Sequence, residues 1–253
     1  MKCFTIYQNG THSWTVYGAD ADRPQLVIDT NQVVIQSGSD ALMCDPGGLE
    51  VFPSMMAALT EQIPIDTIKQ IFLSHQDPDV ASALAVWRQV CTPGIKVHLS
   101  WMWESFVRHF DYGAAFTAIP DEGSTIRLGS VTLQSIPAHY LHSPGNFSLY
   151  DPAAKILFSG DLGAALLPHG TPPTGIFVTD FNAHIRFMEG FHRRWLGSPA
   201  ARDAWVERVA KLDIDILVPQ HGLLMRGDDV GRFLDWLSGL EIGSGIAAMR
   251  AAG

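Results

Sequence analysis

Histidine and aspartate side chains follow four apolar, strand-like runs that lie far apart in the sequence. The first run ends at His75, and the others end close to His142, Asp161 and His221. A glycine or proline breaks the chain after each run. Imidazole and carboxylate groups that meet at strand ends on a rigid sheet suit a metal site, because metal ligands must be deprotonated and held close together against their mutual repulsion. This pattern predicts a sheet-based fold with a metal site at strand ends.

The number of candidate ligands indicates two metal ions, because it exceeds the need of one tetrahedral ion. The candidates are His75, Asp77, Asp79, His142, Asp161 and His221. His139 lies three residues before His142. We expect it either to orient a ligand through a hydrogen bond or to be a polar residue at a strand terminus.

Length and composition describe a chain that can bury a large core. It has 253 residues, 47% of them hydrophobic, and no evident linker, so we expect a single domain over residues 1–253. No run approaches the roughly 18 apolar residues of a membrane span, and no signal peptide is recognisable, so we expect a cytoplasmic location. The net charge of −9 disfavours nucleic acid and anionic lipid as partners. Cys3, Cys44 and Cys91 lack paired spacing and are expected to be buried thiols.

Apolar periodicity predicts strands that alternate with helices. Strands are expected at 4–7, 14–17, 25–29, 33–36, 41–44, 68–74, 96–99, 126–128, 131–136, 147–150, 156–158 and 214–218. Helices are expected at 52–62, 80–90, 103–110, 182–196, 200–212 and 229–240. Strands followed by helix and strand, occurring twice, indicate two sheets packed face to face with helices outside. Asp77 and Pro78 are typical of a helix start, with Asp as the N-cap.

Three further segments have a structural and a functional interpretation. Residues 45–48, Asp-Pro-Gly-Gly, lack a following Lys-Ser or Lys-Thr, so we interpret them as a tight turn rather than a phosphate cradle. The aromatic residues between 101 and 110 are interpreted as core. Phe187, Met188, Phe191 and Trp195 form an apolar helix face that either packs or walls a channel for a diatomic gas.

The order and spacing of the four motifs, over roughly residues 25 to 225, resemble the metallo-β-lactamase superfamily. Residues 75–80, His-Gln-Asp-Pro-Asp-Val, stand where that superfamily carries His-x-His-x-Asp-His, and residues 142–146, His-Ser-Pro-Gly-Asn, are similar to its His-Thr-Pro-Gly-Ser turn. Asp161 and His221 complete the set. The resemblance implies an α/β fold, the four-layer αββα sandwich of that superfamily.

Two departures from the superfamily pattern narrow the resemblance. Asp77 replaces the second histidine of the loop, and Val80, which cannot bind a metal, replaces the last. This combination is similar to the diiron core of flavodiiron proteins, whose loop reads His-x-Glu-x-Asp, and to stand-alone oxygen-binding diiron proteins. Three carboxylates among the ligands also favour iron over zinc, with zinc or manganese as alternatives.

The resemblance implies a division of the ligands between two iron ions. His75, Asp77 and His142 are expected to hold one ion, Asp79 and His221 the other, and Asp161 to bridge them. Because Val80 stands where the superfamily has a histidine ligand and cannot bind a metal itself, the second ion is expected to keep an open coordination position for O2 or water.

The implied function is a nonheme diiron protein that binds or reduces O2, with NO as a second candidate ligand, or one that senses O2. No Gly-rich nucleotide fingerprint or iron–sulfur cysteine set is recognisable, so we expect no flavin in this chain and electrons from an external donor protein. The sequence leaves open whether the protein forms a homodimer. The alternatives are a binuclear hydrolase acting on an ester, thioester or phosphodiester, with Arg186, Arg193 and Arg226 as candidate anchors, and a signalling module that changes a partner surface with oxygen occupancy.

Overall fold

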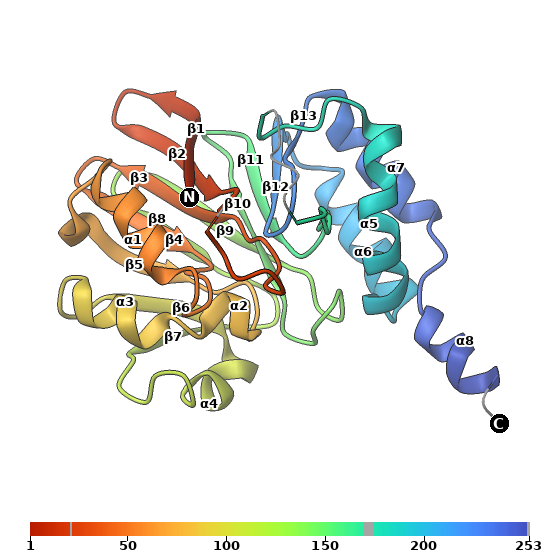
Figure 1. Ribbon diagram of the computed structural model, residues 1–253, viewed down its shortest axis with the longest axis horizontal. Helices are drawn as coiled ribbons and strands as arrows, with labels where there is room; N and C mark the ends of the chain where they lie inside the picture. Colours follow the sequence, from red (N-terminus) through yellow and green to blue (C-terminus); the bar gives the residue numbers. More distant parts are fainter. Residues whose placement is uncertain (21, 170–174, 252–253) are drawn as a thin grey trace.

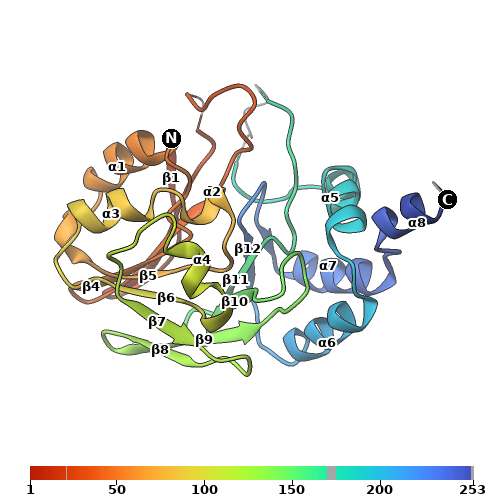
Figure 2. The ribbon, with the colours of Figure 1, turned by 90° about the horizontal axis from the view of Figure 1, so that it is seen from below.

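Two β-sheets packed face to face form the centre of the molecule, and helices cover their outer faces (Figure 1). The computed structural model describes residues 1–20, 22–169 and 175–251. Helices lie beyond both sheets when the molecule is turned by 90° (Figure 2). The predicted arrangement of two sheets between outer helices, as in the αββα sandwich, is therefore confirmed.

The first sheet has seven strands in the order of the sequence. They are β1 (Lys2–Asn9), β2 (His12–Gly18), β3 (Gln32–Ser37), β4 (Asp40–Cys44), β5 (Ile68–Phe72), β6 (Lys96–Ser100) and β7 (Phe116–Ile119). The first four pair antiparallel and the last four pair parallel. Because β4 to β7 run in one direction, the loops that follow β4 and β5 leave the sheet at the same edge.

The second sheet has six strands in the order β13-β12-β11-β10-β9-β8. They are β8 (Thr125–Leu128), β9 (Val131–Pro137), β10 (Phe147–Asp151), β11 (Ile156–Gly160), β12 (Ile216–Pro219) and β13 (Met225–Arg226). Only β11 and β12 pair parallel among these described strands. Their carboxyl ends are therefore neighbours, and each leads directly into a candidate ligand.

The helices fall into two groups, one for each sheet (Figure 1). The first comprises α1 (Phe52–Thr60), α2 (Pro78–Ala81), α3 (Leu84–Val90) and α4 (Glu104–Val107), with the 3-10 turns η1 (Ile65–Thr67) and η2 (Trp101–Trp103). The second comprises α5 (Phe181–Trp195), α6 (Pro199–Val209), α7 (Asp228–Gly239) and α8 (Ser244–Ala251). Asp180 and Ser198 cap α5 and α6 by accepting hydrogen bonds from backbone N–H groups of the first turn. Among the described residues, the helices lack the length and apolarity needed to cross a bilayer.

Three apolar layers hold these elements together. Residues such as Trp14, Phe147 and Phe158 fill the space between the two sheets. One outer cluster, which includes Trp87, joins the first sheet to α1 and α3, and another, which includes Phe233, joins the second sheet to α5, α6 and α7. The cysteines are all free: Cys44 and Cys91 are buried as predicted, whereas Cys3 is only partly buried.

A buried polar cluster joins the two sheets at the edge away from the carboxyl ends of β4 and β5. Asp151, at the end of β10, accepts hydrogen bonds from His12 Nε2 (2.7 Å) and Trp14 Nε1 (2.8 Å) on β2. Its other carboxylate oxygen accepts from the backbone N–H groups of Ala153 (2.9 Å) and Ala154 (3.2 Å). The Asp151 side chain is inaccessible to solvent.

The prediction of a strand at 25–29 is wrong. This segment lies outside both sheets, with Leu26 almost fully exposed. Its backbone is engaged locally, because Val27 donates its N–H to the carbonyl of Pro24 (2.9 Å) and accepts from Arg23 Nε (3.0 Å). An apolar run alone does not make a strand when the neighbouring strands are already paired on both sides.

Two predicted helices are shorter than expected. The helix predicted at 80–90 is divided into α2 and α3, which are separated by Ser82 and Ala83. The helix predicted at 103–110 is reduced to η2 and α4. Trp101 and Phe106, interpreted as core, are exposed, and Trp101 Nε1 donates to Asp121 (2.7 Å).

Candidate metal centre

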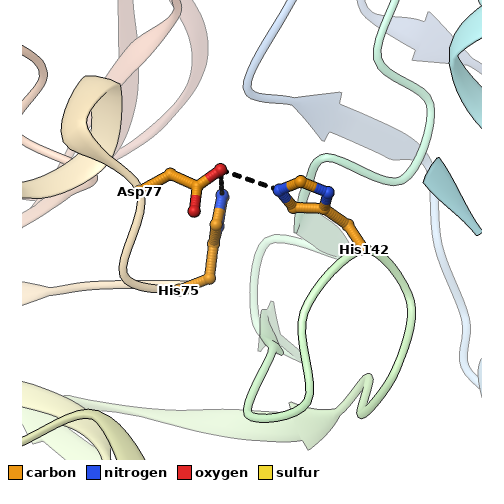
Figure 3. Close-up of side chains that lie close together, drawn as sticks. All are labelled: His75, Asp77 and His142. Atoms are coloured by element: carbon orange, nitrogen blue, oxygen red, sulfur yellow. Dashed lines mark hydrogen bonds and ion pairs between the residues drawn. The ribbon is translucent and has the colours of Figure 1, made fainter. Parts of the chain in front are cut away.

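The loop after β5 carries the first three candidate ligands. His75 follows the end of β5 and is buried, and the chain then enters α2 at Pro78. Asp77 has the extended backbone of an N-cap, as predicted, but its side chain makes no capping hydrogen bond. The carboxylate instead accepts a hydrogen bond from His142 Nε2 (2.8 Å) (Figure 3). Asp77 is therefore available to the centre rather than to the helix.

Three side chains form a compact group that could hold a metal ion. One ligand atom each from His75, Asp77 and His142 lie within 4.8 Å of one another. Both imidazole rings face the carboxylate of Asp77 (Figure 3), and His75 Nε2 lies 3.7 Å from Asp77 Oδ2. His142 adopts a backbone φ of +85°, which few residues other than glycine adopt. Such conformations cluster at functional sites.

Asp161 lies between this group and the remaining candidates. Its Oδ2 atom is 3.9 Å from His75 Nε2 and 3.7 Å from His142 Nε2. Its Oδ1 atom is 3.5 Å from His221 Nε2, which in turn is 3.4 Å from Asp79 Oδ2. The structure thus brings all six predicted residues together, and the two oxygens of Asp161 face different members of the set.

The geometry and chemistry of these residues fit metal ions. Ligands bound at about 2.1 Å to one ion lie about 3 to 3.5 Å apart, close to the nitrogen–oxygen separations around Asp161. The Oδ1 atom of Asp161 is buried and has no hydrogen-bond partner among the described residues. A buried, unpartnered carboxylate oxygen is costly unless a cation or donor compensates it. Together, the three carboxylates and three imidazoles make an oxygen-rich set of donors, which suits iron.

The carboxylates strongly affect the protonation of the imidazoles. Burial by itself lowers the pKa of His75, but Asp161 and Asp77 outweigh it and raise the pKa to about 9. His221 has its pKa raised to about 9 in the same way, against burial, by Asp161 and Asp79. Burial opposes ionisation of Asp161, yet His75 and His221 hold its pKa well below the usual range. Since a bound metal needs neutral imidazole, metal binding at neutral pH should release protons from these histidines.

A buried hydrogen-bond chain that sequence reasoning missed orients His75. Asp45, interpreted as part of a tight turn, is inaccessible to solvent and accepts hydrogen bonds from Ser74 N (2.7 Å) and Ser74 Oγ (2.6 Å). The same hydroxyl lies 2.8 Å from His75 Nδ1. If the hydroxyl donates to Asp45 it accepts from Nδ1, which leaves Nε2 directed at the centre. The available signal was an aspartate directly after an apolar strand, the pattern shared by the ligands.

The loop after β12 is held by the segment that was wrongly predicted as a strand. His221 Nδ1 donates to the carbonyl of Asp29 (2.9 Å), which again leaves Nε2 free to face the centre. Asn31 donates three hydrogen bonds to this loop, from its backbone N–H to the carbonyl of Gln220 (2.6 Å) and from Nδ2 to the carbonyls of Pro219 (2.9 Å) and Gly222 (2.8 Å). The residues at 29–31 therefore fix the position of His221.

Other residues singled out by sequence lie around the centre. The buried Val80 belongs to the apolar cluster beneath α1 and α3. His139 Nε2 hydrogen-bonds to the carbonyl of Asp121 (2.8 Å), and its described hydrogen bonds do not reach the six candidates. Phe191 on α5 lies 6.0 Å from His142 between ring centroids and stacks on Trp195 (5.3 Å). This helix face therefore contacts the centre, while a gas channel along it stays a prediction.

Comparison with protein families gives one clear match. A family model described as "ODP family beta lactamase" matches residues 28–222, which include all six candidates. No curated protein matches the chain.

Solved structures resemble this one over nearly its whole length. A structure of the peroxy diiron species of the chemotaxis sensor ODP is 35% identical, with a TM-score of 0.84 over 96% of this chain and 97% of that chain. The apo state of the chemotaxis sensor ODP from T. denticola is 36% identical, with the same TM-score and 96% of both chains covered. The rubredoxin oxygen:oxidoreductase of Desulfovibrio gigas is 17% identical, with a TM-score of 0.80 over 93% of this chain and 61% of that chain. At that identity the last likeness concerns the fold alone.

Proposed function

Since this chain belongs to the ODP family of beta lactamases, we propose that it is a nonheme diiron protein that binds O2 and acts as an oxygen sensor. Support comes from the similarity to the chemotaxis sensor ODP, which has been observed as a peroxy diiron species. The similarity covers 96% of this chain at 35% identity. A second line of support is the set of six side chains at the candidate metal centre, whose donor chemistry suits iron.

The position of Asp161 carries the proposal. One carboxylate oxygen faces His75 and His142, and the other faces His221. A carboxylate placed in this way is suited to bridge two cations. One ion would be held by His75, Asp77 and His142, the other by Asp79 and His221, and Asp161 would bind both.

The iron ions, when bound, would supply the reversible oxidation and the affinity for O2. The protein side chains have different tasks. Asp45 and Ser74 orient His75, and the carbonyl of Asp29 orients His221, so that each imidazole presents Nε2 to the centre. Phe191 on α5 packs close to His142 and places an apolar ring beside this candidate ligand.

Electron supply distinguishes sensing from turnover. A sensor needs a single reaction with O2 and a later reset, whereas steady reduction of O2 needs continuous electrons. We infer that an external donor protein performs the reset. The arginines considered as anchors for a hydrolase substrate are engaged elsewhere: Arg193 pairs with Glu189 and Glu241, and Arg186 and Arg226 lie over phenylalanine rings.

Metal analysis combined with spectroscopy tests the proposal. Protein loaded anaerobically with ferrous iron should contain two irons per chain and change its near-ultraviolet and visible absorption when O2 is added. Asp161→Asn should lower the iron content and remove magnetic coupling in Mössbauer spectra, because an amide is a poor bridge. Asp213→Asn, a matched change at a largely exposed carboxylate, should leave both unchanged. Zinc in place of iron after iron-replete expression, or no response to O2, would refute the proposed function.

A further inference from the structure

A basic concavity lies at the edge of the first sheet opposite the candidate metal centre. It measures about 460 Å³ and is lined by Asp40, Lys69, Gln70, Thr92, Lys96 and Arg127, together with the turn 93–95 and Gly129. Lys69 and Lys96 stand at the amino ends of β5 and β6, whereas His75 follows the carboxyl end of β5. Since each strand residue advances the chain by about 3.3 Å, the concavity is a separate site roughly 20 Å from His75.

The charge of this concavity is opposite to that of the whole chain. The protein has 26 acidic and 17 basic residues, yet Lys69, Lys96 and Arg127 face a single carboxylate, Asp40, in the lining. None of these three cations forms an ion pair with another described residue, whereas Arg23, Arg88 and several other arginines elsewhere do. Unpaired cations that line one concavity create a local positive potential that attracts anions.

Hydrogen bonds from both sheets build the wall of the concavity. Lys69 Nζ donates to Thr92 Oγ1 (3.2 Å), and this hydroxyl donates to the carbonyl of Asp66 (3.0 Å). Gln70 on β5 donates from Nε2 to the carbonyl of Arg127 on β8 (2.8 Å). The lysine and the arginine backbone are therefore held in place before any ligand arrives.

Gly129 is required for this shape. Its φ is +54°, and a Cβ atom there would lie 2.4 Å from the carbonyl oxygen of Ser37. The turn that presents Arg127 and closes the rim thus depends on a residue without a side chain.

We propose that this concavity binds a small polyanion bearing phosphate groups. Lysine and arginine donate charge-assisted hydrogen bonds to phosphate oxygens, and donors from β5, β6 and β8 meet around one compact volume. A compact cluster of phosphate charge satisfies such donors together. An extended acidic peptide would space its carboxylates along a chain that this volume does not enclose.

Calorimetric titration of the full-length, iron-loaded protein tests the site, with inorganic pyrophosphate as the probe at constant ionic strength. Lys96→Gln combined with Arg127→Gln should weaken binding by roughly tenfold or more, because two charge-assisted contacts are lost. The control combines Arg208→Gln with Lys211→Gln, which removes two exposed charges near the end of α6 and should leave binding unchanged. Chelation of iron by pyrophosphate would persist in both double variants, so the loss of binding in only one of them distinguishes binding in the concavity from chelation.

Three results would overturn the proposal: no saturable binding to the wild type, equal weakening in both double variants, or tighter binding of hexaglutamate peptide than of pyrophosphate. Because the concavity is remote from the metal centre, none of these outcomes bears on the proposed oxygen chemistry.

Discussion

Removing the carboxylate of Asp151 should destabilise the protein strongly. This buried side chain accepts four hydrogen bonds, two from side chains of the opposite sheet and two from backbone N–H groups. Asp151→Ala leaves all four donors unpaired in a space that water reaches poorly. The donors belong to His12, Trp14, Ala153 and Ala154.

The expected cost follows from these contacts. At about 1 kcal/mol for each unpaired buried donor, the loss of free energy of unfolding is about 4 kcal/mol, which agrees with the range of about 3 to 5 kcal/mol for breaking a buried ion pair. For a chain of this size the midpoint of thermal unfolding should fall by roughly 8 to 16 °C. Urea unfolding followed by tryptophan fluorescence and circular dichroism measures the free energy directly.

A control separates this effect from the loss of a charge in general. Asp213 is largely exposed and pairs with Lys155 at 2.8 Å, and exposed pairs of this kind contribute less than about 1 kcal/mol. Asp213→Ala should therefore have little effect. If Asp151→Ala cost no more than Asp213→Ala, the cluster would not be a stabilising link between the sheets.

Three further predictions concern the same framework. Ser74→Ala should weaken metal binding by roughly 10- to 100-fold in a chelator competition assay, because the imidazole it orients loses its support, and an equal effect of the exposed Ser238→Ala would exclude this explanation. Gly222→Ala should cost about 2 to 3 kcal/mol in urea unfolding, because its φ is +85° and a Cβ would lie 2.6 Å from the Ala165 carbonyl oxygen. Gly10→Ala, with φ +58° and open space around the Cβ, isolates the backbone contribution and should cost clearly less. The contribution of His12 to the free energy of unfolding should be fully present below pH 6.5 and decline as the pH rises through the raised pKa of His12. A difference in free energy of unfolding between wild type and His12→Asn that does not change with pH would contradict this.

The pH prediction for His12 rests on hydrogen-bond geometry as well as on charge. Both ring nitrogens face acceptors, Nδ1 the carbonyl of Gln36 (2.9 Å) and Nε2 the carboxylate of Asp151 (2.7 Å), so the ring donates to both acceptors only when it carries both protons. Burial lowers the pKa of His12, but the hydrogen bond to Asp151 outweighs it and the pKa is raised. A histidine whose pKa is higher in the folded state stabilises that state while it is protonated and ceases to do so as it deprotonates.

The candidate ligands could be predicted from sequence because they share one local signal. His75, His142, Asp161 and His221 each follow an apolar run and lie within three residues of a later glycine or proline, and Asp77 and Asp79 belong to the same loop as His75. Strand ends on packed sheets converge in space. Asp45 carries the same signal but was interpreted as a turn, since the glycines after it dominate local reasoning. Its role depends on the hydroxyl of Ser74, 29 positions away in the chain, and such long-range contacts are absent from any local pattern.

Other features depend on tertiary context that the sequence does not display. Residues 25–29 have the composition of a strand, yet they run outside the sheets and hold His221 through the carbonyl of Asp29. The basic concavity combines residues from β4, β5, β6 and β8, whose cations are scattered singly along the chain. Neither feature has a periodicity or a spacing from which it could be predicted.

The six candidate ligands are divided equally between the two sheets. His75, Asp77 and Asp79 follow β5, whereas His142, Asp161 and His221 lie in loops of the second sheet. The Asp151 cluster joins the same sheets at their other edge, so hydrogen bonds link the sheets at one end, and side chains from both sheets would hold the iron ions at the other. Removal of metal ions from this centre would therefore take away one of the two links between the sheets and leave the Asp151 cluster as the other.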